Sequence, residues 1–428
     1  MEVSVSMPAP SPQEAFVQGR IINLVRSGRA RTRPELELET GLGRKVVHQR
    51  VQTALSAGLL ADGELTPSGG GRPSRSLRFR SDAGHVFAGV IGAEELTAAV
   101  ADLDGNLKAK QHMDWNASTG PDATMERLDE LFVNLARRTG TSPWGFGIGV
   151  AGPVDFGSGR LVDPPIMPGW DDYSIRSWLR ERYDSPVWVD NDVNLMALGE
   201  WHRGHPADGR DLLYIFLDTG IGGGLVSRGK VFRGDSGAAG DIGHIQVTDD
   251  PTILCRCGRT GCLEAAAGGW SIARRLTAHA SESPVLTAAL RGREALSAGD
   301  IAKAFSTGDP LTVAMLHASA VTVGTTTANL VNFANPGTVV IGGGALRLGD
   351  DFFAELEDAV RHRTTALAGR CLTVRRASLD YTEGVVGAAI LAIEHLFDPD
   401  LLGLWAPSGS PLGYAAPLQK STSGTIPA

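Results

Sequence analysis

The sequence predicts a small, mostly helical winged helix-turn-helix unit followed by a large α/β region, and three observations support this. Residues 13–80 contain three helix-like stretches and then an extended return. From residue 85 onward, strand-like runs alternate with helix-like runs, which is typical of α/β layers. The charge changes at the same place: residues 1–80 carry twelve Lys/Arg and seven Asp/Glu, although the whole chain has a formal charge of -8. Only the first unit is therefore expected to meet a polyanion.

Length and composition set the broad class. A chain of 428 residues with 42% hydrophobic residues predicts two or three compact units. No run of about 18 apolar residues occurs, and no basic segment with an apolar stretch opens the chain, so we expect a cytoplasmic protein without membrane partners. Residues 1–12 and the tail 401–428, rich in Pro, Ser and Gly, are expected to be disordered.

The first two helices of the N-terminal unit have recognisable patterns. Between Gln13 and Ser27, apolar residues recur at helical spacing. Thr32 and Glu35 form a predicted capping box, with Pro34 in the first turn, and this short second helix is expected to end near Gly41.

The third helix is expected to carry the DNA contacts. Val47, Val51 and Leu55 form its apolar stripe, and a Gly-Arg-Pro segment after residue 66 resembles a wing. Basic side chains in these positions reach base edges in the major groove or phosphates. The alternative is a helical adaptor with a solvated basic face. The candidate DNA-binding residues are Arg44, Lys45, His48, Arg50, Arg72 and Arg75.

The α/β region places glycine-rich segments after apolar strands, where α/β proteins bind ligands. The expected strands are Val86–Ile91, Ala98–Leu103, Trp144–Val150, Leu212–Leu217 and Thr338–Ile341, and the expected helices are Met125–Thr139 and 310–332.

A metal site is predicted from His244, Cys255, Cys257 and Cys262. One imidazole and three thiolates form a closed tetrahedral zinc site, and the full ligand count indicates a structural Zn²⁺ rather than a catalytic one. The alternative is three buried free cysteines that cluster by chance. Cys371 stands apart and is expected to be a packed core residue.

At this point the sequence resembles the ROK family of repressors and sugar kinases. The most specific stretch is residues 237–244, Gly-Ala-Ala-Gly-Asp-Ile-Gly-His, followed by the cysteines and Leu263-Glu264. Residues 189–194, 197–200, 219–224 and 332–336 are similar to the family pattern too, and the resemblance runs from about residue 13 to 397.

The resemblance implies a two-lobed, actin-like sugar-kinase fold of the ribonuclease H-like class over residues 81–400, with a zinc loop at 244–262. It implies a sugar site at Gly152, Asn191, Asp192, Asp241, His244 and Glu264. Carboxylates and an amide suit neighbouring hydroxyl groups. The alternative for Asp241 and Glu264 is that they are turn or cap residues supporting the zinc loop. Kinase members usually have Glu at position 241, so the shorter Asp puts that sugar contact in doubt.

Kinase activity is not expected. The family's phosphate loop, Asp-x-Gly-Gly-Thr, corresponds here to Val90-Ile91-Gly92-Ala93-Glu94. A metal-facing carboxylate is lost and a negative side chain is gained, and both changes oppose binding of ATP and Mg²⁺. Asp192 matches the catalytic base, a role it holds only if kinase activity persists. The second glycine loop is interpreted as architectural.

Members with this N-terminal unit usually regulate carbohydrate genes. We therefore expect a sugar-responsive regulator, with repression favoured over activation, that binds a double-stranded operator as a homodimer or homotetramer and responds to a sugar or sugar phosphate. Two alternatives remain: an ATP-dependent hexose kinase with an attached DNA-binding domain, and a dimerisation module that receives its signal from a partner protein.

Overall fold

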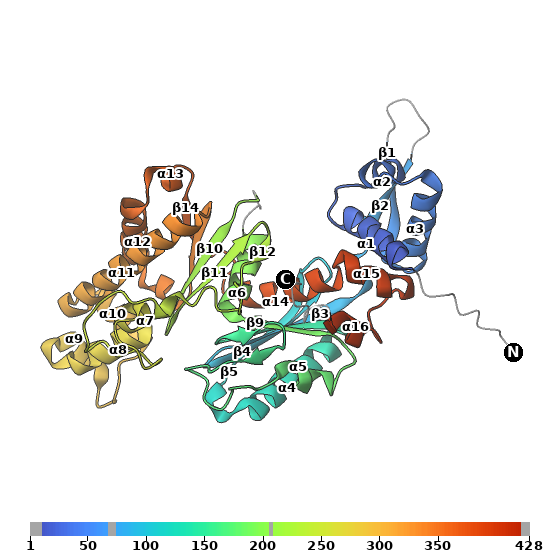
Figure 1. The fold of residues 1–428 in the computed structure, drawn as a ribbon. Coiled ribbons are helices and arrows are strands. Elements are labelled where there is room, and N and C mark those ends of the chain that lie inside the picture. The colour runs from blue at the N-terminus through green and yellow to red at the C-terminus, as the bar shows by residue number, and fades with distance from the viewer. Residues whose placement is uncertain (1–10, 67–73, 205–208, 421–428) are drawn as a thin grey trace.

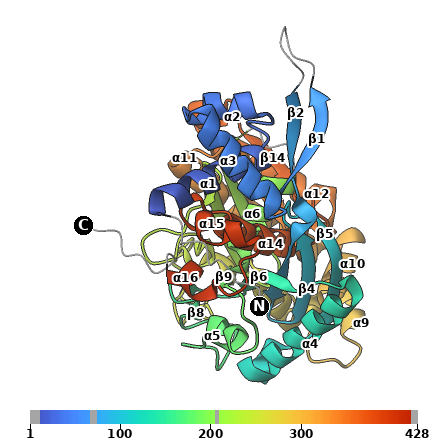
Figure 2. The same ribbon diagram turned by 90° about the vertical axis from the view of Figure 1, so that its right-hand side faces the viewer.

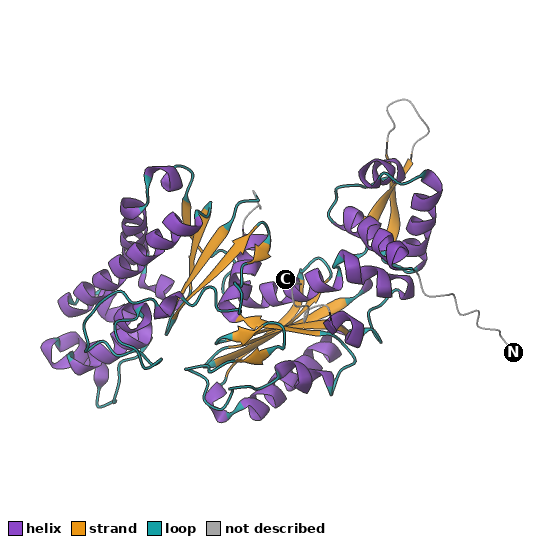
Figure 3. Cartoon of the chain, in the orientation of Figure 1, coloured by secondary structure: helices purple, strands orange, loops and turns teal. Residues whose placement is uncertain are grey.

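The computed structural model describes residues 11–66, 74–204 and 209–420. An N-terminal unit (blue in Figure 1) lies beside one lobe, drawn in cyan and green, and a second lobe in yellow and orange lies on the far side. Each lobe has a central sheet with helices packed on it, as Figure 3 shows. Within the described ranges, no helix has the length and apolar character needed to cross a membrane.

The N-terminal unit has the predicted order of three helices and an extended return. Thr32 and Glu35 form the expected capping box, and α2 ends at Gly41, whose positive φ of 70° suits a glycine. The two strands pair antiparallel from Leu60 opposite Phe79. The elements are α1 (Pro12–Arg26), α2 (Arg33–Thr40), α3 (Arg44–Ser56), β1 (Leu60–Thr66) and β2 (Ser74–Phe79).

The first lobe is built on a five-stranded sheet of order β5-β4-β3-β6-β9. The three strands β3 to β5 run antiparallel, and β6 and β9 continue parallel to β3. Helix α4 packs against β4 and helix α5 against β9. The elements are β3 (His85–Ile91), β4 (Glu95–Asp102), β5 (Leu107–Asp114), α4 (Pro121–Thr139), β6 (Pro143–Val150), β7 (Val154–Asp155), β8 (Arg160–Leu161), α5 (Ile175–Arg180) and β9 (Val187–Asn191).

The second lobe repeats this topology with the order β12-β11-β10-β13-β14. Again a hairpin of antiparallel strands precedes two strands parallel to its first member. The elements are β10 (Leu212–Leu217), β11 (Ile221–Ser227), β12 (Lys230–Val231), α7 (Leu263–Ala267), α8 (Gly269–Ala278), α9 (Pro284–Leu290), α10 (Ala298–Ser306), α11 (Pro310–Ala334), β13 (Thr338–Gly342), α12 (Asp350–Arg363), α13 (Ala366–Gly369) and β14 (Thr373–Arg376).

Two helices, α6 (Asp192–Gly199) and α14 (Glu383–Leu396), pack tightly against each other between the lobes. A side chain at Gly199 or Gly387 would collide with the backbone of the other helix. Short turns complete the chain: 3₁₀ turns η1 (Ser81–Ala83), η2 (Ala117–Thr119), η4 (Ile242–His244), η5 (Ala280–Glu282), η6 (Gly344–Leu348) and η7 (Ala406–Ser408), and a π-helical turn η3 (Glu200–Gly204).

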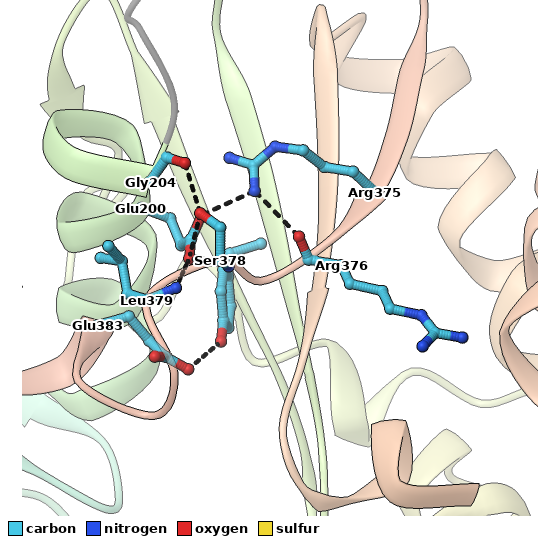
Figure 4. A network of polar contacts seen from close by, with 8 residues as sticks. Glu200, Gly204, Arg375, Arg376, Ser378, Leu379 and Glu383 are labelled. Carbon is cyan, nitrogen blue, oxygen red and sulfur yellow. Dashed lines mark hydrogen bonds and ion pairs between the residues drawn. The ribbon is translucent and has the colours of Figure 1, made fainter. Parts of the chain in front are cut away.

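A buried polar network ties the end of α6 to the second lobe (Figure 4). Glu200 is 1% exposed and accepts hydrogen bonds from Arg375 at 2.8 Å and from the Ser378 amide at 2.6 Å. Beside it, the Tyr214 hydroxyl donates to Glu383 at 2.9 Å. Burial raises the pKa of the Glu383 carboxyl, which the Tyr214 hydrogen bond opposes. The hydrogen bonds of Glu200 to Arg375 and Ser378 therefore connect α6 to the strand and loop of the second lobe.

The expectation that residues 401–428 form a disordered tail is wrong for the described part. Helices α15 (Pro399–Trp405) and α16 (Ala415–Lys420) are ordered. The Trp405 side chain is fully buried, and α15 lies between α1 and α14 (Figure 2). Asn23 in α1 donates to the Phe397 carbonyl oxygen at 2.6 Å. The Pro, Ser and Gly residues that suggested disorder form the turns between apolar anchors.

The last described helix also docks on the first sheet. The Gln419 side chain donates to the carbonyl oxygen of Val187 at 2.9 Å and accepts from its amide at 3.2 Å. This pair of bonds satisfies one residue of the edge strand β9 much as a neighbouring strand would. The N-terminal unit and the first lobe are thus joined through one apolar core that includes Ile21, Phe79 and Trp405.

Candidate functional site

His244 and three cysteines converge at one point in the second lobe. His244 ends the turn η4, Cys255 and Cys257 lie in the following loop, and Cys262 precedes α7. The Nδ1 atom of His244 is 3.6 Å from Cys255 Sγ, and the Sγ atoms of Cys257 and Cys262 are 3.8 Å apart. All four candidate ligand atoms lie within 4.8 Å of one another.

This geometry fits a tetrahedral zinc ion. With Zn–S bonds of about 2.3 Å, two ligand sulfurs of a tetrahedron lie about 3.8 Å apart. Burial opposes ionisation of Cys257, but hydrogen bonds from the Arg259 amide and side chain lower the pKa of its thiol to about 7. Cys371 lies apart from this cluster and is exposed, so its expected place in the core is wrong.

Asn191 and Asp192 lie at the junction of β9 and α6. The Asn191 side-chain amide donates to the Gly152 carbonyl oxygen at 3.0 Å, and its Oδ1 accepts from the amides of Val193 and Asn194. Asn191 therefore caps the helix while contacting the loop after β6. The structure brings Gly152, Asn191 and Asp192 together, as the family resemblance implies.

Asp192 is 8% exposed. Burial first, and then the negative charges of Glu95 and Asp190, raise the pKa of its carboxyl to about 6. Its Oδ1 accepts the Val193 amide at 2.9 Å. A buried carboxyl with this pKa suits either a sugar hydroxyl contact or proton transfer.

The remaining predicted sugar residues lie in the second lobe. Asp241 Oδ1 is 3.8 Å from Nε2 of His244, so the ring presents Nδ1 to the cysteines and Nε2 toward Asp241. Glu264 is 9% exposed and accepts from the Ile221 amide at 3.2 Å and from the Trp270 indole at 3.1 Å. Both Glu264 oxygens thus hold the local fold together, which agrees with the supporting role considered as its alternative.

Arg233 is a residue that sequence reasoning missed. It forms an ion pair with Asp190 at 2.7 Å, and its guanidinium lies 3.9 Å from the Phe156 ring centre. Asp190 in turn accepts from the Asn191 amide at 2.8 Å. The loop that leads to Asp241 is therefore anchored beside Asn191. A lone arginine among glycines carries no sequence signal for such a contact.

The turn between β3 and β4 departs from a phosphate loop in the structure as well. Val90 is buried, and its methyl group lies 3.2 Å from the position that a Cβ would take at Gly384 in α14. Glu94 and Glu95 are exposed at the turn. Two carboxylates and no opposing cation on the turn itself disfavour a polyphosphate.

The second glycine loop has a packing role. A Cβ at Gly222 would lie 2.8 Å from a methyl of Val193, and a Cβ at Gly224 would lie 2.8 Å from the Ala197 side chain. These glycines let β11 lie directly on α6, so the contacts agree with the architectural interpretation.

The candidate DNA-binding residues separate into two groups. Arg44, Lys45 and His48 are exposed on α3, away from its buried residues. Arg75 on β2 is exposed, and Arg72 lies outside the described residues. Arg50 does not join them: its side chain is 15% exposed and pairs with Glu14 of α1 at 2.8 Å. Helical periodicity explains this, because residue 50 lies one turn from the core positions 47 and 54.

Comparison with known proteins places this geometry in context. The model of the ROK family matches residues 88–395. The xylose repressor of Bacillus subtilis is 25% identical over 368 residues, 86% of this chain and 92% of its own. A glucokinase of Halalkalibacterium halodurans is 34% identical over 249 residues, 58% of this chain and 75% of its own.

Solved structures with a similar fold also include both a transcriptional regulator and a kinase. A ROK family transcriptional regulator, a homologue of the Escherichia coli Mlc protein, has a TM-score of 0.77 at 24% identity and covers 93% of this chain and all of its own. The ROK glucokinase of Streptomyces griseus, in complex with glucose and AMPPNP, has a TM-score of 0.64 at 28% identity and covers 72% of this chain and 99% of its own.

Proposed function

The chain belongs to the ROK family, and from this premise we propose that it is a sugar-responsive transcription repressor. One observation carries the proposal: the match to the xylose repressor covers 86% of this chain, whereas matches to glucokinases cover 58% and 71%. The similarity to repressors therefore extends beyond the kinase-like lobes, and the three helices and hairpin before residue 80 supply a DNA-binding unit.

We propose that this winged helix-turn-helix unit inserts α3 into the major groove. Arg44, Lys45 and His48 are the exposed basic side chains of its first two turns, where recognition helices contact base edges. Arg75 on the hairpin is proposed to contact the phosphate backbone of the DNA. Arg50 instead holds α3 against α1 through Glu14.

The effector is proposed to be a sugar or sugar phosphate bound by Asn191, Asp192, Asp241, His244 and Glu264, with Gly152 beside them. Their amide and carboxylate oxygens suit hydroxyl groups. A structural Zn²⁺ on His244, Cys255, Cys257 and Cys262 would fix the orientation of His244 at this site. The exposed acidic turn at Glu94 makes ATP a poor ligand, so the kinase-like cleft is proposed to sense rather than to phosphorylate.

A homodimer is proposed to form on α11. This helix of 25 residues contains no Asp, Glu, Lys or Arg, yet Val321 is 43% exposed. Val321 and Ile245, which follows His244, line a groove of about 410 Å³. A surface helix without charge is typical of a buried interface. Lysine at Val321 should produce monomers in analytical ultracentrifugation, while lysine at the exposed Ala354 of α12 should not.

The decisive experiment is a mobility shift of the full chain on DNA from its own gene neighbourhood, repeated with glucose, xylose, N-acetylmannosamine and their phosphates. We expect a specific shift that one sugar releases, and that an R44A/K45A variant lacks while R50K retains it. A specific shift that no sugar changes would favour the alternative in which this region only dimerises and a partner protein carries the signal. Sugar-dependent ATP consumption that D192N abolishes would establish the kinase instead.

A further inference from the structure

The indole of Trp270 lies beside Glu264. Trp270 Nε1 donates to Glu264 Oε1 at 3.1 Å, while the Ile221 amide donates to Oε2 at 3.2 Å. The carboxylate is 9% exposed, so these two donors fix the plane of a nearly buried group. Each oxygen keeps further lone pairs for another donor, such as a ligand hydroxyl.

The indole ring is itself held by two arginines. The guanidinium carbon of Arg256 lies 4.5 Å from its centre, and that of Arg274 lies 5.0 Å away. Arg256 stands between Cys255 and Cys257 in the zinc loop, whereas Arg274 is one helical turn along α8 from Trp270. Guanidinium groups pack favourably on indole rings. The position of Trp270 therefore depends on the zinc loop.

The backbone of Trp270 adds a third connection. Its amide donates to the Thr219 carbonyl oxygen at 3.0 Å, in the turn between β10 and β11. A Cβ at Gly220 in this turn would lie 2.7 Å from Glu264 Oε2. Trp270 thus joins the zinc loop, the Glu264 carboxylate and the second hairpin turn in one set of contacts.

We propose that Trp270 is a positioning residue of the sugar site. Its indole orients the Glu264 carboxylate toward the effector, and Arg256 makes this orientation depend on the zinc loop. The proposal rests on the proposed function, because Glu264 is a sugar contact only if the chain binds a sugar. With guanidinium groups packed on the ring, the indole N–H is the part of Trp270 that acts on the site. The effector class is a neutral or phosphorylated sugar with a hydroxyl that donates to Glu264.

The test is a double-mutant cycle on the full, zinc-loaded chain, with calorimetric titration of glucose and xylose. Trp270→Phe keeps an aromatic ring, although a smaller one than the indole, and removes the N–H donor. We expect it to weaken binding of the preferred sugar about 10-fold, within the range of a hydrogen bond to a charged group. In an E264A background the same change should have almost no effect, because the carboxylate that it positions is gone. Zinc content should stay at that of the wild type.

Two further variants separate positioning from folding. Trp270→His retains a ring N–H and should recover part of the affinity, whereas Arg256→Met removes the contact between the ring and the zinc loop and should lose part of it. Equal losses from W270F in the wild-type and E264A backgrounds would overturn the proposal and make Trp270 a packing residue. Failure of the wild type to bind either sugar, or any in the mobility-shift panel, would overturn the proposed function and this proposal together.

Discussion

The two hairpin turns that open the two sheets occupy equivalent places but differ in what packs against their glycines. The turn between β3 and β4 exposes Glu94 and Glu95 and has no cation of its own. The turn between β10 and β11 holds Asp218, Thr219 and Gly220. Asp218 and Thr219 are exposed here as well, but the Thr219 carbonyl oxygen accepts a hydrogen bond from the Trp270 amide at 3.0 Å. Both turns therefore expose acidic side chains, and they differ in the group that lies next to their glycine.

The glycines of the two turns differ in how readily they could be replaced by a residue with a side chain. Gly92 faces the flexible side chain of Glu95, while Gly220 faces the fixed carboxylate of Glu264. A side chain added beside a fixed neighbour is tolerated poorly, whereas one added beside a flexible, exposed side chain is tolerated well. We therefore expect the first turn to accept a side chain at its glycine more readily than the second.

The largest expected effect comes from breaking the support of the second turn. Cys257→Ser removes a zinc ligand and should lose about one zinc per chain. The melting temperature should fall by about 10 °C, because metal binding and local folding are coupled. Calorimetry with metal analysis measures both, and Cys371→Ser, at an exposed position away from the cluster, is the control. Unchanged stability in C257S would show that the second turn does not depend on the metal.

A matched pair of glycine substitutions tests the comparison directly. Gly220→Ala places a Cβ 2.7 Å from Glu264 Oε2, so we expect a loss of about 2 kcal/mol in unfolding free energy and weaker sugar binding. Gly92→Ala places a Cβ 2.9 Å from Glu95 Cγ, an exposed side chain that can move, and should cost less than about 0.5 kcal/mol. Denaturant unfolding of both variants measures the difference. Equal losses of unfolding free energy would contradict the distinction between the fixed neighbour of Gly220 and the flexible neighbour of Gly92.

Burial of Asp192, together with the negative charge of Glu95 in the first turn, predicts a pH dependence of stability. Its pKa is raised to about 6, so ionisation of the buried carboxyl lowers stability as the pH rises from about 4 through 6. Asp192→Asn should therefore be more stable than the wild type at pH 8 by about 2 kcal/mol. The difference should vanish below about pH 3, where the carboxyl is protonated in both the folded and the unfolded state. Melting curves across this range decide the point, and a constant difference would argue against a raised pKa.

The smallest expected effect is a gain at the first turn. The double substitution V90D/E94T restores two residues of the family's phosphate loop and should give weak, Mg²⁺-dependent ATP binding that the wild type lacks. We expect millimolar affinity, since Glu95 and the buried surroundings of Val90 still oppose the ligand. Titration calorimetry with ATP measures it. Tight ATP binding by the wild type would reverse the interpretation of this turn.

Local patterns allowed much of the fold and site to be predicted. The capping box at Thr32, the glycine turn at Gly41 and the spacing of His244 and the cysteines each depend on a few neighbouring residues. The ion pair of Arg50 with Glu14, and the order after residue 400, depend on partners that are distant in the sequence. Arg233 and Trp270 escaped prediction for the same reason, since their partners are set only by the tertiary fold.

Helix α15 has a further consequence for how the protein is made. The contacts of α1 with α15, such as Gly19 with Pro399, join residues some 380 positions apart in the chain. Contacts of such separation form late during folding. The N-terminal unit can form its own helices early in translation. Its packing against the first lobe can form only after Trp405 has left the ribosome. A nascent or prematurely ended chain would therefore have an N-terminal unit that is not packed against the first lobe.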